Sequence, residues 1–516
     1  MRVDKIPFKK TAGFSRLFLD YIDSRSQLAH THSFEPSVAG FEKALSYRKL
    51  SEENRETLVN VLTQQYEGLK ITEVVGQNIK LLKEKNTFTV TTGHQLNIFT
   101  GPLFFIYKIV SVINICKKLA QEFPEYKFIP VYWMASEDHD FEEINHAFID
   151  NEKYVWETSQ SGAVGHFHLE ELAKLSNKIP GRSDVFINAY NNSSNLADAV
   201  RHYVNELFGE YGLVVVDANN KDLKAEFKSY IKDDLTLHTA YHKVNSRSKF
   251  LEKQGYKPQL NAREINLFYL DENIRSRIEK KDDRYYLADM EISFSESEIL
   301  DLVEKHPERF SPNVILRPLY QEVILPNLGY VGGPAEVAYW LQFKEMFDFF
   351  RIDYPVLMPR SFGLYLGKNA QRKKEKLNLL FEDLFTQADV LKKKYVHTKN
   401  GRLDLAEERK KVVKVYNSIR SLAEDIDPTL DSHILAKFQK HQECLDEIEA
   451  KLVKAEKRNR DDEMNMITYL NEYVYPSGTL QERRVNYLSI HDDEFIPKLI
   501  TNTDPFDLRM HIYMEY

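Results

Sequence analysis

The chain has 516 residues, and its length and charge already exclude several kinds of protein. Its formal net charge is −8, from 78 acidic and 70 basic residues, whereas a general nucleic-acid-binding protein would carry a basic surplus. With 42% hydrophobic residues the chain can bury a large core, but it is too long for one simple core. We therefore expect two or three structural units and no nucleic-acid partner.

Cysteine use and hydropathy indicate the cellular compartment. Cys116 and Cys444 are the only cysteines, and their spacing indicates neither a metal site nor a disulfide. This usage is typical of a reducing cytosol. The first residues lack the apolar stretch of a signal peptide, and no apolar run is long enough to cross a membrane. We expect a cytoplasmic protein without a membrane partner.

The first half of the chain predicts an α/β core. Residues 1–85 are expected to be mainly helical, and a strand at 88–92 then leads to an apolar helix at 103–119. Pro102 suits the first turn of that helix, because its missing N–H would be unpaired there. Further strands are expected at 128–134, 212–217 and 354–358. Continuous apolar strands are typical of a parallel sheet that is covered on both faces.

Two intervals interrupt this alternation of strands and helices. Residues 150–200 contain short alternating segments at 154–157 and 165–169, and residues 255–300 contain similar ones at 267–270 and 285–288. Alternation of apolar and polar residues is typical of half-buried strands. We therefore predict two small β elements inserted into a core over 1–365, at about 150–200 and about 218–310.

The last third of the chain predicts a helical arm. From Ile434 to Tyr473 apolar residues recur in steps of four and three, which is the pattern of a coiled coil. A shorter seam at 412–426 ends before Pro428, and a third stretch spans 377–391. Asn400-Gly401 and Pro476-Ser477-Gly478 mark turns. We predict a three-helix antiparallel arm over 366–475 that pairs two copies as a homodimer, with residues 476–516 returning to the core.

A glycine-histidine turn follows the first predicted core strand. Gly93 supplies the conformational freedom that a tight turn needs, and it is followed by His94 and Gln95. His94 can donate a hydrogen bond to an anion. The helix that begins after Gly101 would present unpaired N–H groups, which attract phosphate or carboxylate. The alternative is that these residues only form a turn and begin a helix.

A second cluster of ionisable residues follows the next strand. It comprises Glu137, Asp138, His139 and Asp140, and in a parallel sheet it would share one edge with His94. Asp and His can bind zinc or manganese, but adjacent residues cannot all face one ion. Acid–base catalysis by one carboxylate and His139 suits this cluster better. A solvated, helix-capping loop is the remaining alternative.

A third turn has the same character. Gly332 and Gly333 precede a proline and Glu336 at the start of an apolar helix, where the backbone can approach a ligand closely. Upstream, Arg317 and Gln321 would lie within reach if that segment is extended. Arginine suits planar recognition of carboxylates.

Four segments together resemble the family of cysteine-adding enzymes of bacillithiol biosynthesis. They are residues 92–108 (TGHQLNIFTGPLFFIYK), 132–144 (YWMASEDHDFEEI), 332–336 (GGPAE) and 359–361 (PRS). The first two motifs are long and specific, and the resemblance covers essentially the whole chain.

The resemblance implies a fold and a reaction. The fold would be a Rossmann-like parallel-sheet core similar to class I aminoacyl-tRNA synthetases, with two connective-peptide insertions and a dimerising coiled coil. The reaction would be that of a ligase, joining the carboxyl group of cysteine to the amine of glucosaminyl malate. The resemblance also implies that Thr92, Asn97 and Lys108, which belong to its first motif, bind substrate or anion.

Two departures from the synthetase pattern concern activation of the carboxyl group. Only Gly93-His94 stands where a synthetase would have His-x-Gly-His, and Pro359-Arg360-Ser361 stands where it would have a lysine-rich loop. ATP or ADP is the cofactor that the resemblance suggests, and no metal or redox cofactor is expected. The nucleotide would then meet the following residues: Arg360, Ser361, Phe362, Gly363 and Arg483.

These expectations assign roles to the polar turns. Asp138 or Asp140, assisted by His139, would accept the amine proton. His94 and the helix start at Gly101 would stabilise developing negative charge. Arg317 is the candidate for the malate carboxylates. A metal-dependent hydrolase or transferase at Asp138-His139-Asp140, and a non-catalytic coiled-coil scaffold, stay open as alternatives.

Overall fold

The computed structural model describes residues 1–11, 13–179, 181, 184–288, 290–399, 403 and 405–515. It divides into two compact units. The larger unit comprises Met1–Lys9, Gly13–Tyr365 and Gln481–Tyr513, and the smaller one is built around Leu366–Leu480. The larger unit thus contains segments from both sides of the smaller one in sequence.

The larger unit is organised around a sheet of five parallel strands in the order β13-β12-β2-β3-β6. The strands are β2 (Thr87–His94), β3 (Lys127–Met134), β6 (Val214–Asp217), β12 (Asn327–Gly332) and β13 (Val356–Pro359). All but β12 are predicted from sequence. The sequence of β12 contains Asn327, Gly329 and Gly332, residue types that weaken a strand pattern.

Helix α5 (Phe104–Glu122) follows β2 and is buried over most of its length, as its apolar sequence predicts. Its start differs from the prediction. Leu103 is its N-cap residue, and Pro102 instead forms an isolated bridge with Asn486. Phe99, Thr100 and Gly101 all have positive φ angles, so the chain is still turning there and the helix begins later than expected.

The N-terminal region is mainly helical, as predicted, after a first strand β1 (Arg2–Ile6). Its helices are α1 (Arg16–Ile22), α2 (Val38–Tyr47), α3 (Glu52–Gln65) and α4 (Glu73–Leu81). A Ser or Thr hydroxyl caps each helix by accepting a hydrogen bond from a backbone N–H three residues on; these residues are Ser15, Ser37, Ser51 and Thr72.

The prediction of a β element over 150–200 is wrong for most of that interval. Strands β4 (His146–Ile149) and β5 (Glu152–Val155) form a hairpin, but the rest is helical. The helices are α7 (Glu170–Ser176), α8 (Asp184–Asn192) and α9 (Leu196–Phe208). Phe186, Ala189 and Tyr190 are buried at helical spacing, a pattern that the short alternating segments obscured.

The second predicted insertion, at about 218–310, does contain a β element, which has five strands, but its first part is helical from Lys221 to Lys253. Its antiparallel sheet has the order β10-β9-β8-β7-β11. The strands are β7 (Leu267–Asp271), β8 (Ile274–Lys281), β9 (Arg284–Leu287), β10 (Ser293–Ser295) and β11 (Phe310–Pro312). The helices between β6 and β13 are α10 (Lys221–Ala225), α11 (Lys228–Thr236), α12 (Thr239–Lys253), α13 (Glu296–Lys305), α14 (Arg317–Ile324), α15 (Pro334–Trp340) and α16 (Lys344–Phe350).

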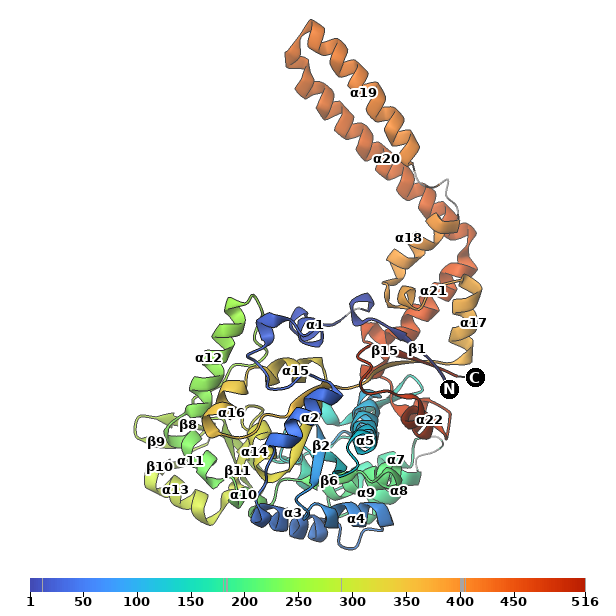
Figure 1. Cartoon of the computed structure of the whole chain (residues 1–516). Helices are drawn as coiled ribbons and strands as arrows, with labels where there is room; N and C mark the ends of the chain where they lie inside the picture. Colours follow the sequence, from blue (N-terminus) through green and yellow to red (C-terminus); the bar gives the residue numbers. More distant parts are fainter. Residues whose placement is uncertain are drawn as a thin grey trace. The chain divides into compact units, whose positions relative to one another are not determined.

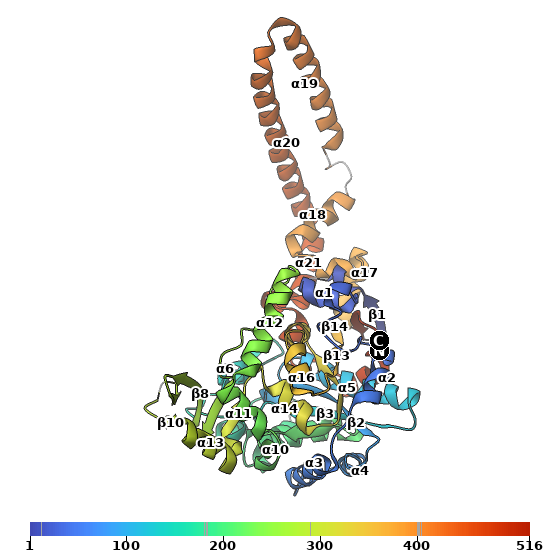
Figure 2. The same ribbon diagram turned by 60° about the vertical axis from the view of Figure 1, so that its left-hand side comes forward.

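The smaller unit is helical, but it is not a three-helix arm. Helices α19 (Ala406–Ile426) and α20 (Asp431–Asn459) form a two-helix hairpin, seen side by side in Figures 1 and 2. The predicted third stretch forms the shorter helices α17 (Lys368–Leu377) and α18 (Ala388–Lys399), and α21 (Asp461–Val474) follows a break at Arg460. The predicted turn at Asn400-Gly401 lies outside the described residues.

The C-terminal segment adds helix α22 (Phe495–Asn502) and strand β15 (Met510–Met514). Strand β15 lies between β1 and β14 (Phe362–Leu366) in a three-stranded sheet. None of the helices in the described part of the chain combines the length and hydrophobicity needed to span a lipid bilayer.

Burial of His511 in β15 makes stability depend on pH. Burial, and then Lys5, lowers the pKa of His511 from 6.5 to about 4. Between these values the unfolded chain binds a proton that the folded chain does not, so the free energy of unfolding should fall as the pH is lowered. We expect His511→Phe to reduce this slope in urea unfolding between pH 7 and pH 4.5. The exposed His491 supplies the control His491→Phe, and an equal slope in wild type and His511→Phe would contradict the prediction.

Candidate active site

A cavity of about 1060 Å³ opens at the carboxyl ends of β2 and β3. Its other walls come from the start of α14 and α15 and from the antiparallel sheet of β7, β8 and β11. Of the residues singled out from the sequence, the following line it: Gly93, His94, Gln95, Lys108, Glu137, Asp138, His139, Arg317 and Glu336. The expectation that the two polar turns meet at one edge is correct for His94, Gln95, Asp138 and His139.

A buried ion pair lies at the inner end of the cavity. The Lys108 Nζ is 2.7 Å from Glu336 Oε2 and donates to the backbone carbonyl of Gly93 at 2.8 Å. Glu336 also accepts hydrogen bonds from the Tyr330 hydroxyl at 2.7 Å and the Gly333 N–H at 2.8 Å. Burial alone would raise the pKa of Glu336, but Lys108 and these hydrogen bonds outweigh it and lower the pKa.

In the part of the chain that the structure describes, no carboxylate lies within ion-pair distance of the Arg317 guanidinium. Its guanidinium lies 5.3 Å from the centre of the Tyr330 ring and 5.7 Å from that of Trp133. One nitrogen donates to the neutral Gln321 side chain at 3.0 Å, and the other, Nη2, is buried with no hydrogen-bond partner among the described residues. Since Glu336 balances only Lys108, this end of the cavity keeps one positive charge to spare. It therefore suits a carboxylate or phosphate group.

His94 can contribute a hydrogen bond but not a charge. Its ring stacks on Phe105 with centroids 5.3 Å apart, and its Nε2 is buried without a partner among the described residues. Burial, then Lys108 and Arg360, lowers its pKa well below the ordinary value. The imidazole is therefore neutral, and it can stabilise an anion only through a single N–H donor.

Asp138 is held by neighbours that keep it ionised. The Gln95 amide donates to Asp138 Oδ2 at 2.9 Å and to Glu143 Oε2 at 2.7 Å, so it joins two carboxylates. Arg275 lies 3.8 Å from Asp138 Oδ1. Burial would raise the pKa of Asp138, but the bond from Gln95 and the charge of Arg275 outweigh it and lower the pKa.

The His139 ring is already engaged. Arg275 Nη1 lies 2.6 Å from His139 Nδ1, and because arginine only donates, Nδ1 accepts this bond. The lone pair on Nδ1 is then not free to take a proton from a substrate. Asp140 is exposed and does not line the cavity, so the structure separates it from Asp138.

Sequence reasoning missed several residues of the cavity wall. Arg275 and Arg277 both line it from β8, and their two-residue spacing puts them on one face of that strand, a signal that the sequence does carry. The fully buried Lys224 pairs with Glu137, another lining residue, and donates to the Phe310 carbonyl at 2.7 Å. No sequence pattern marks Lys224 as part of a site.

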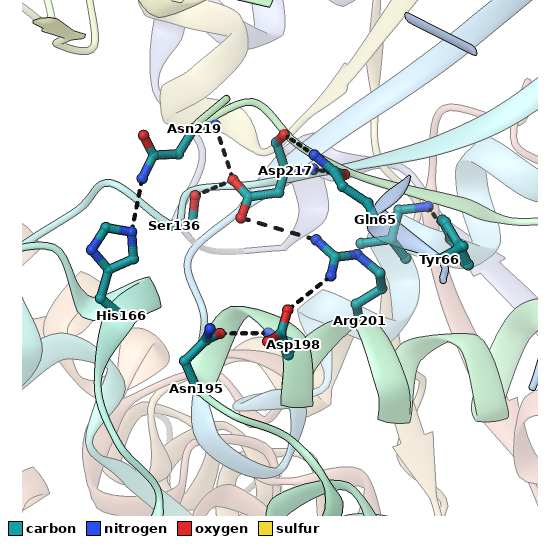
Figure 3. A network of polar contacts seen from close by, with 10 residues as sticks. Gln65, Tyr66, Ser136, His166, Asn195, Asp198, Arg201, Asp217 and Asn219 are labelled. Atoms are coloured by element: carbon teal, nitrogen blue, oxygen red, sulfur yellow. Dashed lines mark hydrogen bonds and ion pairs between the residues drawn. The ribbon is translucent and has the colours of Figure 1, made fainter. Parts of the chain in front are cut away.

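Asp217, at the end of β6, holds residues of the cavity wall in place through hydrogen bonds (Figure 3). It accepts hydrogen bonds from the Ser136 hydroxyl and from the Asn219 N–H, the latter at 3.0 Å, and it lies 4.0 Å from Arg201. Asn219 in turn contacts His166 Nε2 at 3.1 Å. Because Ser136 and Asn219 both line the cavity, this network fixes the edge next to Asp138.

Other predicted substrate residues lie behind the cavity wall. Thr92 donates to the Val331 carbonyl at 2.8 Å, and Asn97 donates to the Glu143 carbonyl at 3.3 Å. Gly101 is buried under Asn486, which donates to its carbonyl at 2.7 Å. Gln321 orients Arg317. The turn of Gly332 and Gly333 contributes through the Gly333 N–H to Glu336 and does not itself line the cavity.

The five residues expected to meet a nucleotide do not line the cavity either: Arg360, Ser361, Phe362, Gly363 and Arg483. Arg360 forms a buried two-pronged pair with Glu482 at 2.6 and 2.9 Å, and the Ser361 N–H donates to Ser111 at 2.8 Å. Phe362 packs in an aromatic cluster, and a Cβ on Gly363 would lie 2.6 Å from the Tyr513 ring. Arg483 is exposed. The polar groups of Arg360 and Ser361 form an ion pair and hydrogen bonds with other residues of the protein, so the nucleotide assignment is not supported at this turn.

The His, Cys, Asp and Glu side chains of the described residues do not indicate a metal site. In the part of the chain that the structure describes, no group of three or more His, Cys, Asp and Glu side chains is placed to hold a metal ion. The Asp138-His139-Asp140 cluster does not converge, because His139 turns toward Arg275 and Asp140 lies outside the cavity. Nothing in this geometry favours the metal-dependent alternative.

Comparison with known proteins supplies the family. The family model described as "Bacillithiol biosynthesis BshC, N-terminal Rossmann-like domain" matches residues 1–361, and "Bacillithiol biosynthesis BshC, C-terminal coiled-coil domain" matches residues 363–515. A relative from Flavobacterium psychrophilum, named "Putative cysteine ligase BshC", is 40% identical over 98% of both chains. Relatives of the same name from Cytophaga hutchinsonii and Bacillus cytotoxicus are 39% and 27% identical, over 99% and 96% of this chain and 99% and 97% of their own.

Among solved structures, one titled as a putative arginyl-tRNA synthetase from Campylobacter jejuni covers 84% of this chain and 100% of its own, at 12% identity. Its TM-score of 0.20 is too low to support any argument. The two family models, in contrast, cover nearly the whole chain and agree with the parallel sheet and the helical hairpin described above. The chain therefore belongs to the BshC family of bacillithiol biosynthesis, with its Rossmann-like and coiled-coil domains.

Proposed function

We propose that this chain is a cytoplasmic cysteine ligase that joins the carboxyl group of L-cysteine to the amine of glucosaminyl malate. The names of its relatives support the reaction class. The observation that carries the proposal is the pairing, in one cavity, of the unpartnered cation Arg317 with the ionised carboxylate Asp138. Both reactants bear carboxylates, and the amine must lose a proton to form an amide.

Asp138 is the proposed acceptor of the amine proton. It is ionised across the neutral range, it lines the cavity, and the hydrogen bond from Gln95 fixes its orientation. His139 is less suited, because its Nδ1 accepts a bond from Arg275. Nitrogen attacks the activated carboxyl carbon, the proton passes to Asp138, and negative charge gathers on the carbonyl oxygen. When the carbonyl reforms, the bond from carbon to the activating phosphate group breaks, and that group leaves with the bonding electrons.

The cationic end of the cavity is the proposed site for the anionic groups. Arg317 would bind the malate carboxylates, with Gln321 holding its guanidinium in place. The neutral His94 ring would donate one hydrogen bond to the developing oxyanion or to a leaving phosphate. Gly101 takes no part, because it is buried beneath Asn486.

Replacing Asp138 tests the catalytic assignment. Asp138→Asn keeps the size and the contact with Gln95 but cannot accept the proton, so we expect kcat to fall by about 100-fold or more. The exposed neighbour Asp140, outside the cavity, supplies the control Asp140→Asn, which should leave kcat unchanged. Amide formation from cysteine and glucosaminyl malate is measured by mass spectrometry of the thiol product. Full activity of Asp138→Asn, or equal losses in both variants, would contradict the assignment.

ATP is the proposed source of carboxyl activation, because a free carboxylate does not acylate an amine at neutral pH. The spare positive charge at Arg317 fits a phosphate group. We expect millimolar ATP or ADP to raise the thermal unfolding temperature, since a ligand at 100 times its Kd stabilises by about 2.7 kcal/mol. Malate should act likewise, and Arg317→Gln should abolish its effect. The absence of a shift with both nucleotides would contradict nucleotide use and point to cysteine that arrives already activated.

We also propose that α19 and α20 pair two copies of the chain as a homodimer. Several apolar side chains of this hairpin are exposed, including Ile419 at 43%, Ile448 at 49% and Leu452 at 40%. Each lies on a predicted coiled-coil seam, and such residues are normally covered.

Sedimentation of the full chain tests this pairing. We expect a dimer at micromolar concentration, and we expect Ile448→Glu/Leu452→Glu to sediment as a folded monomer, because two charges would then face the partner. The control Glu443→Lys changes charge on the same helix without touching the apolar seam. A monomeric wild-type chain would contradict the proposal.

A further inference from the structure

The loop between β2 and α5 contains an unusual stretch of backbone. Phe99, Thr100 and Gly101 have φ angles of 53°, 70° and 66° in succession. Residues with a side chain avoid this region, so Phe99 and Thr100 persist there only because surrounding contacts compensate. At Gly101 a side chain is excluded outright, since a Cβ would lie 2.7 Å from the Cβ of Asn97.

Asn486, from the C-terminal segment, supplies the main compensating contacts. Its side-chain amide is fully buried and donates to the carbonyls of Phe99 and Gly101, both at 2.7 Å. Its Oδ1 accepts from the Leu488 N–H at 2.9 Å, which fixes the orientation of the amide. The neighbouring Val485 carbonyl accepts from the Leu103 N–H at 2.8 Å, at the N-cap of α5.

Two tyrosines hold the same loop from the other side. The Tyr190 hydroxyl accepts the Phe99 N–H at 2.9 Å, and its ring lies 5.4 Å from that of Phe99. The Tyr203 hydroxyl donates to the Asn97 carbonyl at 2.9 Å. The conformation of the loop is thus set by α8, α9 and the C-terminal segment together.

This loop connects two parts of the cavity wall. Before it stands Gln95, which joins Asp138 to Glu143. After it, α5 carries Phe104 and Lys108 into the cavity. A shift of the loop would therefore change the hydrogen bond on Asp138 and the location of Lys108 at once.

We propose that Asn486 is a positioning residue for the active site, which holds the left-handed loop 99–101 and through it aligns Gln95 and α5. Asn486 does not line the cavity, and neither do Phe99, Gly101 and Leu488, to which its side chain is hydrogen-bonded. For its effect on the reaction, the inference rests on the proposed ligase function. The inference about the loop conformation rests on the hydrogen bonds that Asn486, Tyr190 and Tyr203 make to the loop.

A matched pair of variants tests the proposal. Asn114 on α5 makes the same kind of contact away from the cavity: its buried amide donates to the carbonyls of Ile500 at 2.9 Å and Thr503 at 2.7 Å. Asn114→Ala removes these two bonds, and Asn486→Ala removes its two donated bonds together with the one from the Leu488 N–H, so we expect both variants to lower the unfolding temperature and Asn486→Ala to lower it somewhat more. Only Asn486→Ala should lower kcat, by about tenfold or more, because small displacements of reacting groups are costly.

The pH profile gives a second readout that lost stability alone would not move. Since the Gln95 bond helps to keep the pKa of Asp138 low, its loss in Asn486→Ala should move the acidic limb of kcat to higher pH. Asn114→Ala should leave the limb in place. Equal kcat losses in the two variants, or an unmoved limb in Asn486→Ala, would overturn the proposal.

Hydrogen exchange separates this proposal from the proposed function, because it needs no activity. Exchange at the amides of Phe99, Gly101 and Leu103 should be faster in Asn486→Ala than in wild type and unchanged in Asn114→Ala. The milder variant Tyr190→Phe removes only a hydroxyl and should speed exchange at Phe99 in a chain that still folds. Unchanged exchange in both Asn486→Ala and Tyr190→Phe would contradict the proposal that these side chains hold the loop 99–101 in place. An inactive wild-type chain with faster exchange in the variants would overturn only the ligase assignment.

Discussion

The ion pair between Lys108 and Glu336 joins four elements of the core. Lys108 of α5 donates a hydrogen bond to the Gly93 carbonyl at the end of β2 and pairs with Glu336. Glu336 accepts hydrogen bonds from the Tyr330 hydroxyl of β12 and from the Gly333 N–H at the start of α15. Both side chains lie where water is largely excluded, Lys108 at 4% exposure and Glu336 at 21%. A charge buried without its partner is costly, so neither residue is tolerated alone and the four elements must come together. The position of the cavity follows from this constraint.

That pair also explains how the cavity keeps a positive charge. Glu336 is occupied by Lys108, so Arg317 is left to the neutral Gln321 and the faces of Tyr330 and Trp133. Aromatic faces hold a guanidinium in place without neutralising it. At the other side of the cavity, Arg275 is balanced by Asp138. Lys108 and Arg275 thus each lie beside a carboxylate, whereas Arg317 does not, an arrangement that suits substrates that carry both an amine and carboxylates.

The sequence predicts the centre of the site well and its supports poorly. His94, Gln95 and Asp138 follow apolar strands, and parallel strands bring their carboxyl ends to one edge, so their meeting could be foreseen. Arg275 lies in an inserted sheet whose placement over the core depends on tertiary packing. Two wrong predictions have the same cause, because a local pattern does not report the structure beyond its own residues. A four-residue alternation at 154–157 was extended to a domain that is mostly helical, and a heptad pattern across Arg460 hid the break between α20 and α21. Asn486 carries no local signal, because its partner Phe99 lies 387 positions away in the sequence.

The route of the chain has a consequence for biosynthesis. The larger unit takes residues Gln481–Tyr513 from the very end of the sequence, and Asn486 contacts Phe99 across 387 positions. On the ribosome the residues around His94 emerge long before their last hydrogen-bond donors are made. Contacts of such long sequence separation also close slowly. The active arrangement is consequently assembled only after residues 481–513 have been synthesised, so chains released before that point lack the anchor of the β2–α5 loop.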